Sequence, residues 1–173
     1  MTVMRLFQLR AAATTMPLLF AAACASPDPS KELKVADVET YWVIQSKTGD
    51  MTHITPAVRL RLANAGTRTW RAIYLSAAFR LVNQKKEEWG SGWARVPAPG
   101  KVLKPGEQLL VVMVADEGRY HSTGPAESMF NHPKFVDAQV EVYAQMAGSK
   151  QTRLLETRIE RRIGARGVQE YLH

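Results

Sequence analysis

The four histidines are the residues whose chemistry would be most useful in a catalytic or metal site. They are His53, His121, His132 and His173. Zinc-binding proteins place their Cys and His ligands at short, characteristic spacings, and no such spacing occurs in this chain. His121 and His132 share one long segment with nearby acids, so a metal site there is one interpretation. Solvated loop histidines are the more common reason for such a pattern, and we expect no metal.

Nucleophilic chemistry has one superficial candidate, Ser91, which lies between Gly90 and Gly92. In hydrolases with a G-x-S-x-G motif, the serine sits on a sharp turn from a strand into a helix, and that setting is missing around Ser91. The chain also lacks a glycine-rich phosphate loop and a distinctive pair of carboxylates. No catalytic constellation is recognisable, so we expect a protein that is not an enzyme and uses no cofactor.

Tryptophans could serve binding rather than catalysis. Trp89 and Trp93 flank two glycines, and with Trp70 they could form an aromatic face like that of a carbohydrate-binding module. We therefore name Trp89 and Trp93 as ligand-binding candidates. The alternative is structural, because a β-sandwich needs large residues to fill or cap its core, and this explanation is the more common one.

The chain is basic, with a formal net charge of +7. Several arginines gather near its end, and such a stripe is usually a solvated face but could also lie on membrane phosphates or an acidic partner. These arginines are Arg153, Arg158, Arg161, Arg162 and Arg166.

Hydrophobic periodicity indicates strands. Val58, Leu60 and Leu62 alternate with arginines, which is the period of two expected for a strand with one buried face. Similar patterns predict strands at 33–46, 57–64, 70–83, 89–93, 108–114, 138–146 and 152–163. The run at 108–114 is apolar on both faces and is predicted to be central, whereas 152–163 would also suit a helix. About seven strands without a long helix predict an all-β, immunoglobulin-like antiparallel β-sandwich.

The segment 116–135 interrupts this rhythm with glycines, prolines and aromatic residues. A loop this long in a compact domain usually carries function or a short helix, and we expect a helical turn near 125–131. Apolar loop side chains can anchor a partner. We therefore name four residues as partner-binding candidates: Tyr120, Met129, Phe130 and Phe135.

The first residues have the pattern of a secretory signal peptide. Arg5 and Arg10 precede a short, mostly apolar run that ends at Ala23, directly before Cys24, the only cysteine. The run is too short for a membrane-spanning helix, which needs about 20 apolar residues. Small residues followed by cysteine resemble the lipobox of bacterial lipoproteins, although Ala21 stands where that family usually has leucine.

The lipobox resemblance has consequences for processing and location. It implies that residues 1–23 are removed, that Cys24 carries lipid, and that 24–32 tether the domain. The absence of Asp after Cys24 implies an outer-membrane anchor that faces the periplasm. The alternative is a plain secreted protein with a free thiol. The domain is then expected at 33–163, followed by a tail at 164–173, with no disulfide because no second cysteine exists.

A second resemblance covers about a third of the chain. The segment from Val58 to Gly66, and Trp93 followed by Leu103-Lys104-Pro105-Gly106-Glu107, resemble FxLYD-type and YcfL-like periplasmic lipoprotein domains. These families are immunoglobulin-like and mostly of unknown function. A weaker resemblance is to the outer-membrane lipoprotein of type VI secretion, which would make the chain an accessory of a secretion system.

We therefore expect a lipid-anchored interaction or assembly module of the cell envelope. Its partners would be the membrane, through the N-terminal lipid, and another envelope protein, but not nucleic acid, because of the export signal. The alternative is a carrier of a small ligand or glycan that uses Trp89 and Trp93.

Overall fold

The computed structural model describes residues 27–165, so the expected signal peptide, Cys24, Arg166 and the rest of the tail lie outside the described residues. Within 27–165, no helix has the length and apolar character needed to span a bilayer. The described chain starts with α1 (Pro29–Glu32), which is capped by the Asp28 carboxylate, and enters a long hairpin. Strands β1 (Leu33–Thr48) and β2 (Met51–Asn64) pair along their whole length.

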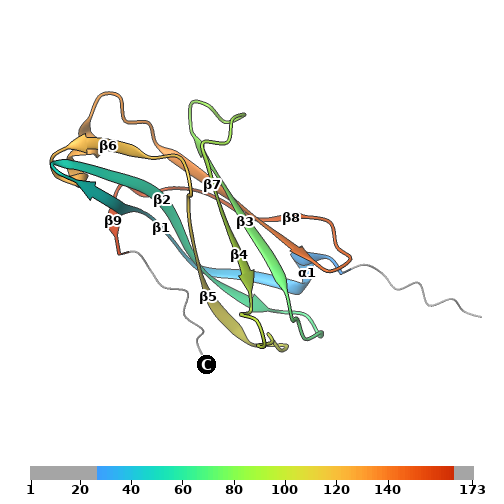
Figure 1. Cartoon of the computed structure of the whole chain (residues 1–173). Helices are drawn as coiled ribbons and strands as arrows, with labels where there is room; N and C mark the ends of the chain where they lie inside the picture. The colour runs from blue at the N-terminus through green and yellow to red at the C-terminus, as the bar shows by residue number, and fades with distance from the viewer. Residues whose placement is uncertain (1–26, 166–173) are drawn as a thin grey trace, which may run out of the picture.

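Two sheets pack face to face as a β-sandwich (Figure 1). The remaining elements are β3 (Ile73–Leu81), β4 (Gly90–Val96), β5 (Gln108–Val114), β6 (Tyr120–Thr123), η1 (Ala126–Asn131), β7 (Ala138–Met146), β8 (Thr152–Arg158) and β9 (Ile163–Gly164). The five-stranded sheet has the order β5-β2-β1-β9, with β6 also paired to β2, and the four-stranded sheet has the order β4-β3-β7-β8. The prediction of an all-β sandwich is confirmed.

The chain crosses repeatedly between the two sheets. β2 leads to β3, β4 to β5, β6 through η1 to β7, and β8 to β9, each time from one sheet to the other. Such crossovers are typical of immunoglobulin-like sandwiches. The pairs are antiparallel except for β9, whose two residues run parallel to β1 beside Trp42 and Val43.

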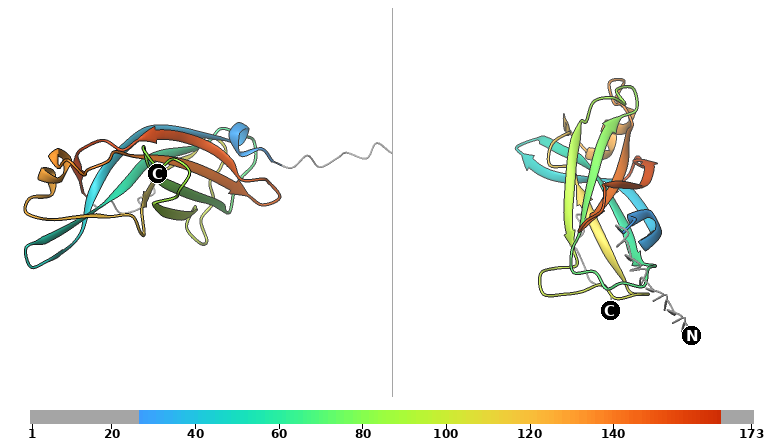
Figure 2. Two further views of the ribbon diagram at one scale, coloured as in Figure 1. Left: turned by 90° about the horizontal axis from the view of Figure 1, so that it is seen from above. Right: turned by 90° about the vertical axis from the view of Figure 1, so that its right-hand side faces the viewer.

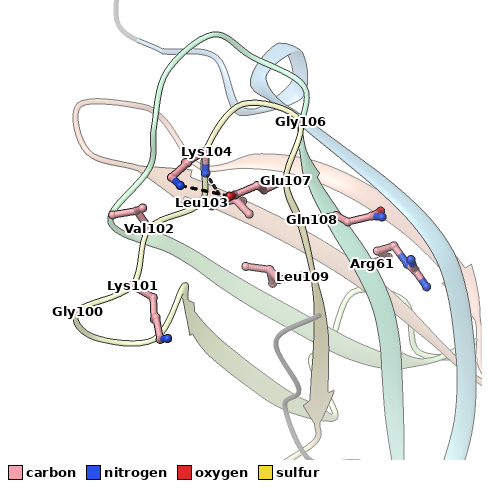
Figure 3. Close-up of a pocket in the computed structure, with 10 residues that line it drawn as sticks. All are labelled: Arg61, Gly100, Lys101, Val102, Leu103, Lys104, Gly106, Glu107, Gln108 and Leu109. Carbon is pink, nitrogen blue, oxygen red and sulfur yellow. Dashed lines mark hydrogen bonds and ion pairs between the residues drawn. The ribbon is translucent and has the colours of Figure 1, made fainter. Parts of the chain in front are cut away.

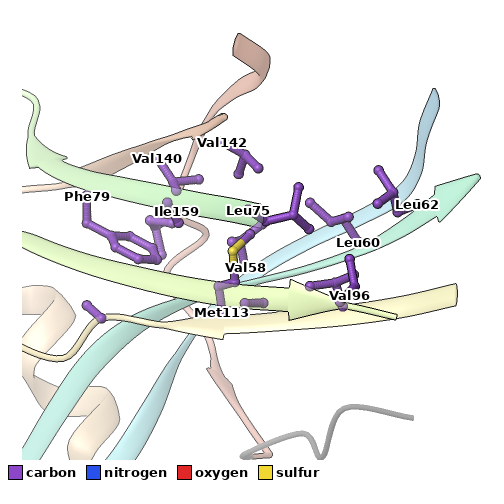
Figure 4. Close-up of a cluster of buried hydrophobic side chains, with 14 of the residues drawn as sticks. Val58, Leu60, Leu62, Leu75, Phe79, Val96, Met113, Val140, Val142 and Ile159 are labelled. Atoms are coloured by element: carbon purple, nitrogen blue, oxygen red, sulfur yellow. The ribbon is translucent and has the colours of Figure 1, made fainter. Parts of the chain in front are cut away.

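The core lies between the sheets and follows the predicted alternation (Figure 4). Inward positions of β2, β3 and β7 are fully buried, because every second side chain of a strand points to the same face. These residues include Val58, Leu60, Leu62, Leu75, Phe79, Val140 and Val142.

Strand β5 lies at an edge, so its prediction as a central strand is wrong. It pairs only with β2, while Leu109, Val111 and Met113 fill the core. Its outward Val114 packs on a second, small cluster on the other face of the same sheet, formed by Tyr41, Val43 and Ala57. The run is apolar on both faces because each face packs on a cluster, not because it has a strand on each side.

The segment 152–163 is a strand only to Arg158, where β8 ends. Thr40 holds the crossing to β9: its hydroxyl donates to the Arg158 carbonyl at 2.9 Å and accepts from the Glu160 N–H at 3.0 Å. Ile159 is buried within this crossing. The helical alternative does not occur, and Gly164, placed in the tail by sequence, belongs to β9.

The segment 24–32 is not a free tether throughout. Pro29 is buried, and the Glu32 carbonyl accepts the N–H groups of Ala65 and Gly66 at 2.9 and 3.2 Å. Helix α1 therefore belongs to the domain, because it satisfies polar groups of the β2–β3 connection. The predicted helical turn near 125–131 is confirmed as η1, and α1 and η1 lie at opposite ends of an elongated molecule (Figure 2).

The edges of the two sheets meet at β4 and β5. A Cβ atom at Gly92 would lie 2.8 Å from the Val114 carbonyl oxygen, and the Asp116 N–H donates to the Ser91 carbonyl at 2.8 Å. The glycines that flank Ser91 therefore permit a close approach of two backbones, as their position in a strand predicts.

Candidate functional site

The loop residues named as partner-binding candidates lie in an aromatic cluster around Trp42. Trp42 is fully buried, and Met129 and Phe130 are 4% and 8% exposed. The Trp42 ring centre lies 5.7 Å from that of Tyr120, 6.4 Å from Phe130 and 5.4 Å from Phe135. Tyr120 and Phe135 are half-buried against the same core. Met129 and Phe130 therefore stabilise the interior and leave little surface for a partner, whereas Tyr120 and Phe135 keep part of their surface exposed.

Polar contacts fix this loop to the rest of the domain. The Tyr120 hydroxyl donates to the Val136 carbonyl and accepts the Val136 N–H, both at 3.1 Å, and burial raises the pKa of this phenol. The Arg161 guanidinium donates to both Asp137 oxygens, which lowers the pKa of Asp137. The same guanidinium donates to the Phe130 carbonyl at 3.1 Å. The segment from β6 to β7 is thus held in place by specific hydrogen bonds and an ion pair.

A hollow of about 390 Å³ lies beside this cluster and is lined by His121 and His132, with Tyr120, Ser128 and Lys134 among its other residues. No carboxylate lines it. Within residues 27–165, no group of three or more His, Cys, Asp and Glu side chains is placed to hold a metal ion. The two histidines thus line one hollow, and the acids near them in sequence, Asp116 and Glu127, are not among its lining residues.

A larger hollow, of about 820 Å³, lies at the opposite end of the molecule, between the 100–106 loop and β5 (Figure 3). Arg61, Lys101 and Lys104 bring three positive charges to it. Arg61 is already paired with Asp37 at 2.8 Å, and Lys104 with Glu107 at 3.8 Å. Lys101 therefore remains as the cation of this hollow without an ion pair among the described residues.

The most exposed large apolar side chains lie elsewhere, on the outer face of the four-stranded sheet. Trp93 is 78% exposed and Tyr74 is 53% exposed. Strand β4 turns Gly92 and Ala94 inward, so Trp93 and Arg95 face solvent. Trp93 pairs with Ser76, and Tyr74 pairs with Arg95. Tyr74 is thus a diagonal neighbour of Trp93, at about 7–8 Å in an antiparallel pair.

The same face continues onto β7. Ser76 pairs with Tyr143 on its other side, so a small residue separates Trp93 from Tyr143. We call the outward-facing residues of this region the aromatic face: Tyr74, Ser76, Trp93, Arg95 and Tyr143.

A network of charged groups borders the aromatic face. The Glu141 carboxylate forms ion pairs with Arg153 at 3.0 Å and Arg80 at 3.6 Å, and accepts a hydrogen bond from the Tyr143 hydroxyl at 3.1 Å. Partial burial, followed by the contact with Glu141, raises the pKa of the Tyr143 phenol. Arg153 also binds Glu156 at 2.7 Å, so two arginines and two carboxylates balance in this network. The border is therefore polar and hydrogen-bonded without a strong field of one sign.

The two candidate tryptophans do not form one site. Trp89 is half-buried, and its ring centre lies 6.1 Å from Trp42 and 5.1 Å from Tyr120. Positions 89 and 93 would share a face in an uninterrupted strand, but β4 begins only at Gly90, and the Trp89 N–H donates to the Phe79 carbonyl as the chain enters it. Trp89 therefore packs inward while Trp93 faces outward.

The C-terminal arginines do not form one free basic stripe. Arg153 binds Glu141 and Glu156, Arg161 binds Asp137, and Arg162 binds Glu160 and Glu39. These partners lie on several elements, which the spacing of the arginines alone does not indicate. The sequence analysis did not name Tyr74 as a binding candidate. The available signal was the alternation in 70–83, which puts Tyr74 on the face opposite the core residues.

No protein-family model and no curated protein matches this chain. Among solved structures, a Northeast Structural Genomics Consortium target designated SoR45 has a TM-score of 0.45 at 10% identity, covering 84% of this chain and 96% of that chain. The putative ApaA protein from Bordetella pertussis has a TM-score of 0.38 at 13% identity, covering 73% of this chain and 91% of that chain. A likeness of this degree indicates nothing about function.

Proposed function

We propose that this chain is a lipid-anchored, non-enzymatic binding module of a bacterial envelope, and that it recognises a protein partner through the aromatic face. The observation that carries the proposal is the 78% exposure of Trp93 beside the 53% exposure of Tyr74. Trp and Tyr dominate the binding energy of protein interfaces, and a large apolar side chain left in water has an unfavourable free energy that a partner can relieve.

The arrangement around Trp93 supports a protein as the partner. Interfaces combine an apolar, aromatic centre with a polar border that exchanges hydrogen bonds. Here the aromatic residues are bordered by the Glu141 network and by Gln151, whose amide donates to the Ser76 hydroxyl at 2.9 Å. A sheet is also a rigid support, so little conformational entropy is lost when its side chains are covered.

The anchor is proposed from the sequence, on the resemblance of the residues before Cys24 to a lipobox. An acylated cysteine would also explain a single thiol in an exported protein, because free thiols are vulnerable in oxidising compartments. Mass spectrometry of the mature N-terminus tests it. A diacylglycerol on Cys24 is expected, and an unmodified thiol would exclude the anchor.

Site-specific photo-crosslinking in native cells tests the partner surface. A benzophenone side chain at Tyr74 or Arg95 should give a discrete crosslinked protein. The same group at Val38 or Met51, the other large apolar positions exposed to solvent, should not. Trp93→Ala should abolish the product by weakening binding by about 2 kcal/mol, which is about thirtyfold. Met51→Ala is the matched control and should leave the product unchanged.

The fluorescence of Trp93 tests the alternative that the aromatic face binds a glycan. Trp42 and Trp70 are buried and Trp89 is half-buried, so iodide should quench mainly Trp93. A glycan that stacks on the aromatic face would protect Trp93 from iodide. Protection by a glycan without any protein crosslink from Tyr74 or Arg95 would replace the proposed partner with a carbohydrate.

A further inference from the structure

One end of the sandwich is built by segments that are distant in sequence. The Asn64 amide donates to the carbonyls of Arg68 and Leu103 at 2.7 and 3.0 Å, and so joins the β2–β3 and β4–β5 connections. Helix α1 adds to them through the Glu32 carbonyl. We call this the tether end: residues 27–32, 65–72, 97–107 and 147–151 (Figure 1).

The tether end carries an excess of positive charge. Its six cations are Lys31, Arg68, Arg71, Lys101, Lys104 and Lys150, against the carboxylates of Asp28, Glu32 and Glu107. Two of the acids pair with neighbouring lysines, Asp28 with Lys31 and Glu107 with Lys104. The other four cations are exposed and have no ion pair among the described residues.

The opposite end has no such excess. Its segments are 47–50, 82–89, 115–119, 124–137 and 159–162, and they carry seven cations against eight carboxylates. Two of these cations, Arg161 and Arg162, are paired. The domain is therefore electrically polar along its length, with its positive end where the described chain begins.

Few residues separate Cys24 from this end along the chain. Pro29 is buried and Asp28 caps α1, so the chain is fixed to the domain from that point onward. From Cys24 to Asp28 the chain can span at most about 14 Å, at about 3.5 Å per residue. A lipid on Cys24 would thus hold the tether end close to the headgroups, at distances where charges are only partly screened by salt.

We propose that the tether end seats directly on the anionic phosphates of the membrane surface, with Arg68, Arg71, Lys101 and Lys150 as the contacting cations. This inference rests on the proposed lipid anchor. Seating fixes the orientation of the domain. The strands lie lengthwise between the two ends of the molecule (Figure 1), so the outer face of the four-stranded sheet would then stand perpendicular to the membrane. Trp93 on that face would remain accessible to a partner approaching from the side.

Vesicle co-sedimentation tests the seating with the mature chain carrying Cys24→Ser, so that no lipid contributes. The chain should bind vesicles of phosphatidylcholine mixed with phosphatidylglycerol, and should not bind vesicles of phosphatidylcholine alone. Binding should weaken as salt is added. The quadruple variant R68Q/R71Q/K101Q/K150Q should bind several hundredfold more weakly, since each basic residue near such a surface contributes about fivefold and four such factors multiply to about 600-fold.

The matched control is K47Q/K85Q/K86Q/K134Q, which removes the same charge from exposed lysines of the opposite end. It should bind within about threefold of the parent chain, because these residues would point away from the membrane. Equal losses in the two variants, or no binding to the anionic vesicles, would overturn the seating. Since the tested chain has no lipid, these outcomes are distinct from an unmodified Cys24, which would remove the anchor itself.

Discussion

Replacing the buried Asn64 with alanine should lower the free energy of unfolding more than replacing any exposed residue of the tether end. Asn64 is 1% exposed. Its amide donates to the Arg68 and Leu103 carbonyls at 2.7 and 3.0 Å, and its Oδ1 accepts the Gly66 N–H at 3.1 Å. The alanine variant removes all three bonds at once and leaves their partners without a side-chain substitute.

The expected loss follows from these three contacts. A hydrogen bond contributes about 1 kcal/mol net, and a buried partner left unsatisfied costs about 1–3 kcal/mol. The Leu103 carbonyl also accepts from the Trp70 N–H, and the Gly66 N–H also donates to the Glu32 carbonyl, so each of these two groups retains one bond. We therefore expect Asn64→Ala to lower the free energy of unfolding by about 3 kcal/mol.

Urea unfolding measures this loss. With a slope of about 2 kcal/mol per molar urea, the midpoint should fall by about 1.5 M without a change in slope. Asn83→Ala is the control, because Asn83 is exposed in the turn after β3. Its free energy of unfolding should change by less than about 0.5 kcal/mol, which is a midpoint shift of less than about 0.25 M. A loss below about 1 kcal/mol for Asn64→Ala would refute the view that this amide joins the two connections.

Three further changes test the rest of the structure. Phe130→Ala should lower unfolding free energy by about 3 kcal/mol in urea titration, since its side chain is 8% exposed in the core; a neutral result would return the loop to the surface. Gly92→Ala should cost about 1–3 kcal/mol, because its Cβ would press on the Val114 carbonyl; an unchanged melting temperature would contradict that contact. Arg161→Gln should be less stable than the parent at neutral pH. Asp137 has a lowered pKa in the folded state, so its contribution is complete above its unfolded pKa of about 4 and is lost as pH falls through the folded value. The difference in unfolding free energy between the parent and Arg161→Gln should therefore shrink below about pH 4. A difference that stays constant with pH would show that Arg161 does not stabilise the ionised Asp137.

The motifs that resemble periplasmic lipoprotein domains have a local physical meaning here. Asn64 lies in the first motif, Val58 to Gly66, and its amide donates to the carbonyl of Leu103 in the second motif. The Gly106 N–H of that motif donates to the Asn64 carbonyl at 2.8 Å. Two motifs that are separate in the sequence thus contact each other, because each supplies hydrogen-bonding groups that the other satisfies. Family membership itself stays a prediction.

By itself, the sequence determined most of the strands and several turns, but not β6, which lies in the predicted loop, or β9. Alternation at Val58–Leu62 and Val140–Ala144 predicts strands because a strand presents every second side chain to one face. Pro125 and the residues after it predict the helical turn that became η1. These features depend on contacts between residues close in the chain, so local pattern carries the information.

Only the tertiary structure decided which predicted residues are available to a partner. Phe130 is enclosed because Trp42, distant in sequence, packs against it, and Trp93 is exposed because no element within residues 27–165 covers the outer face of β4. Arg161 and Arg162 form ion pairs with Asp137 and Glu39, which lie 24 and 123 residues away in the sequence. Burial and ion pairing depend on which elements lie side by side, and the spacing of residues along one segment does not contain that arrangement.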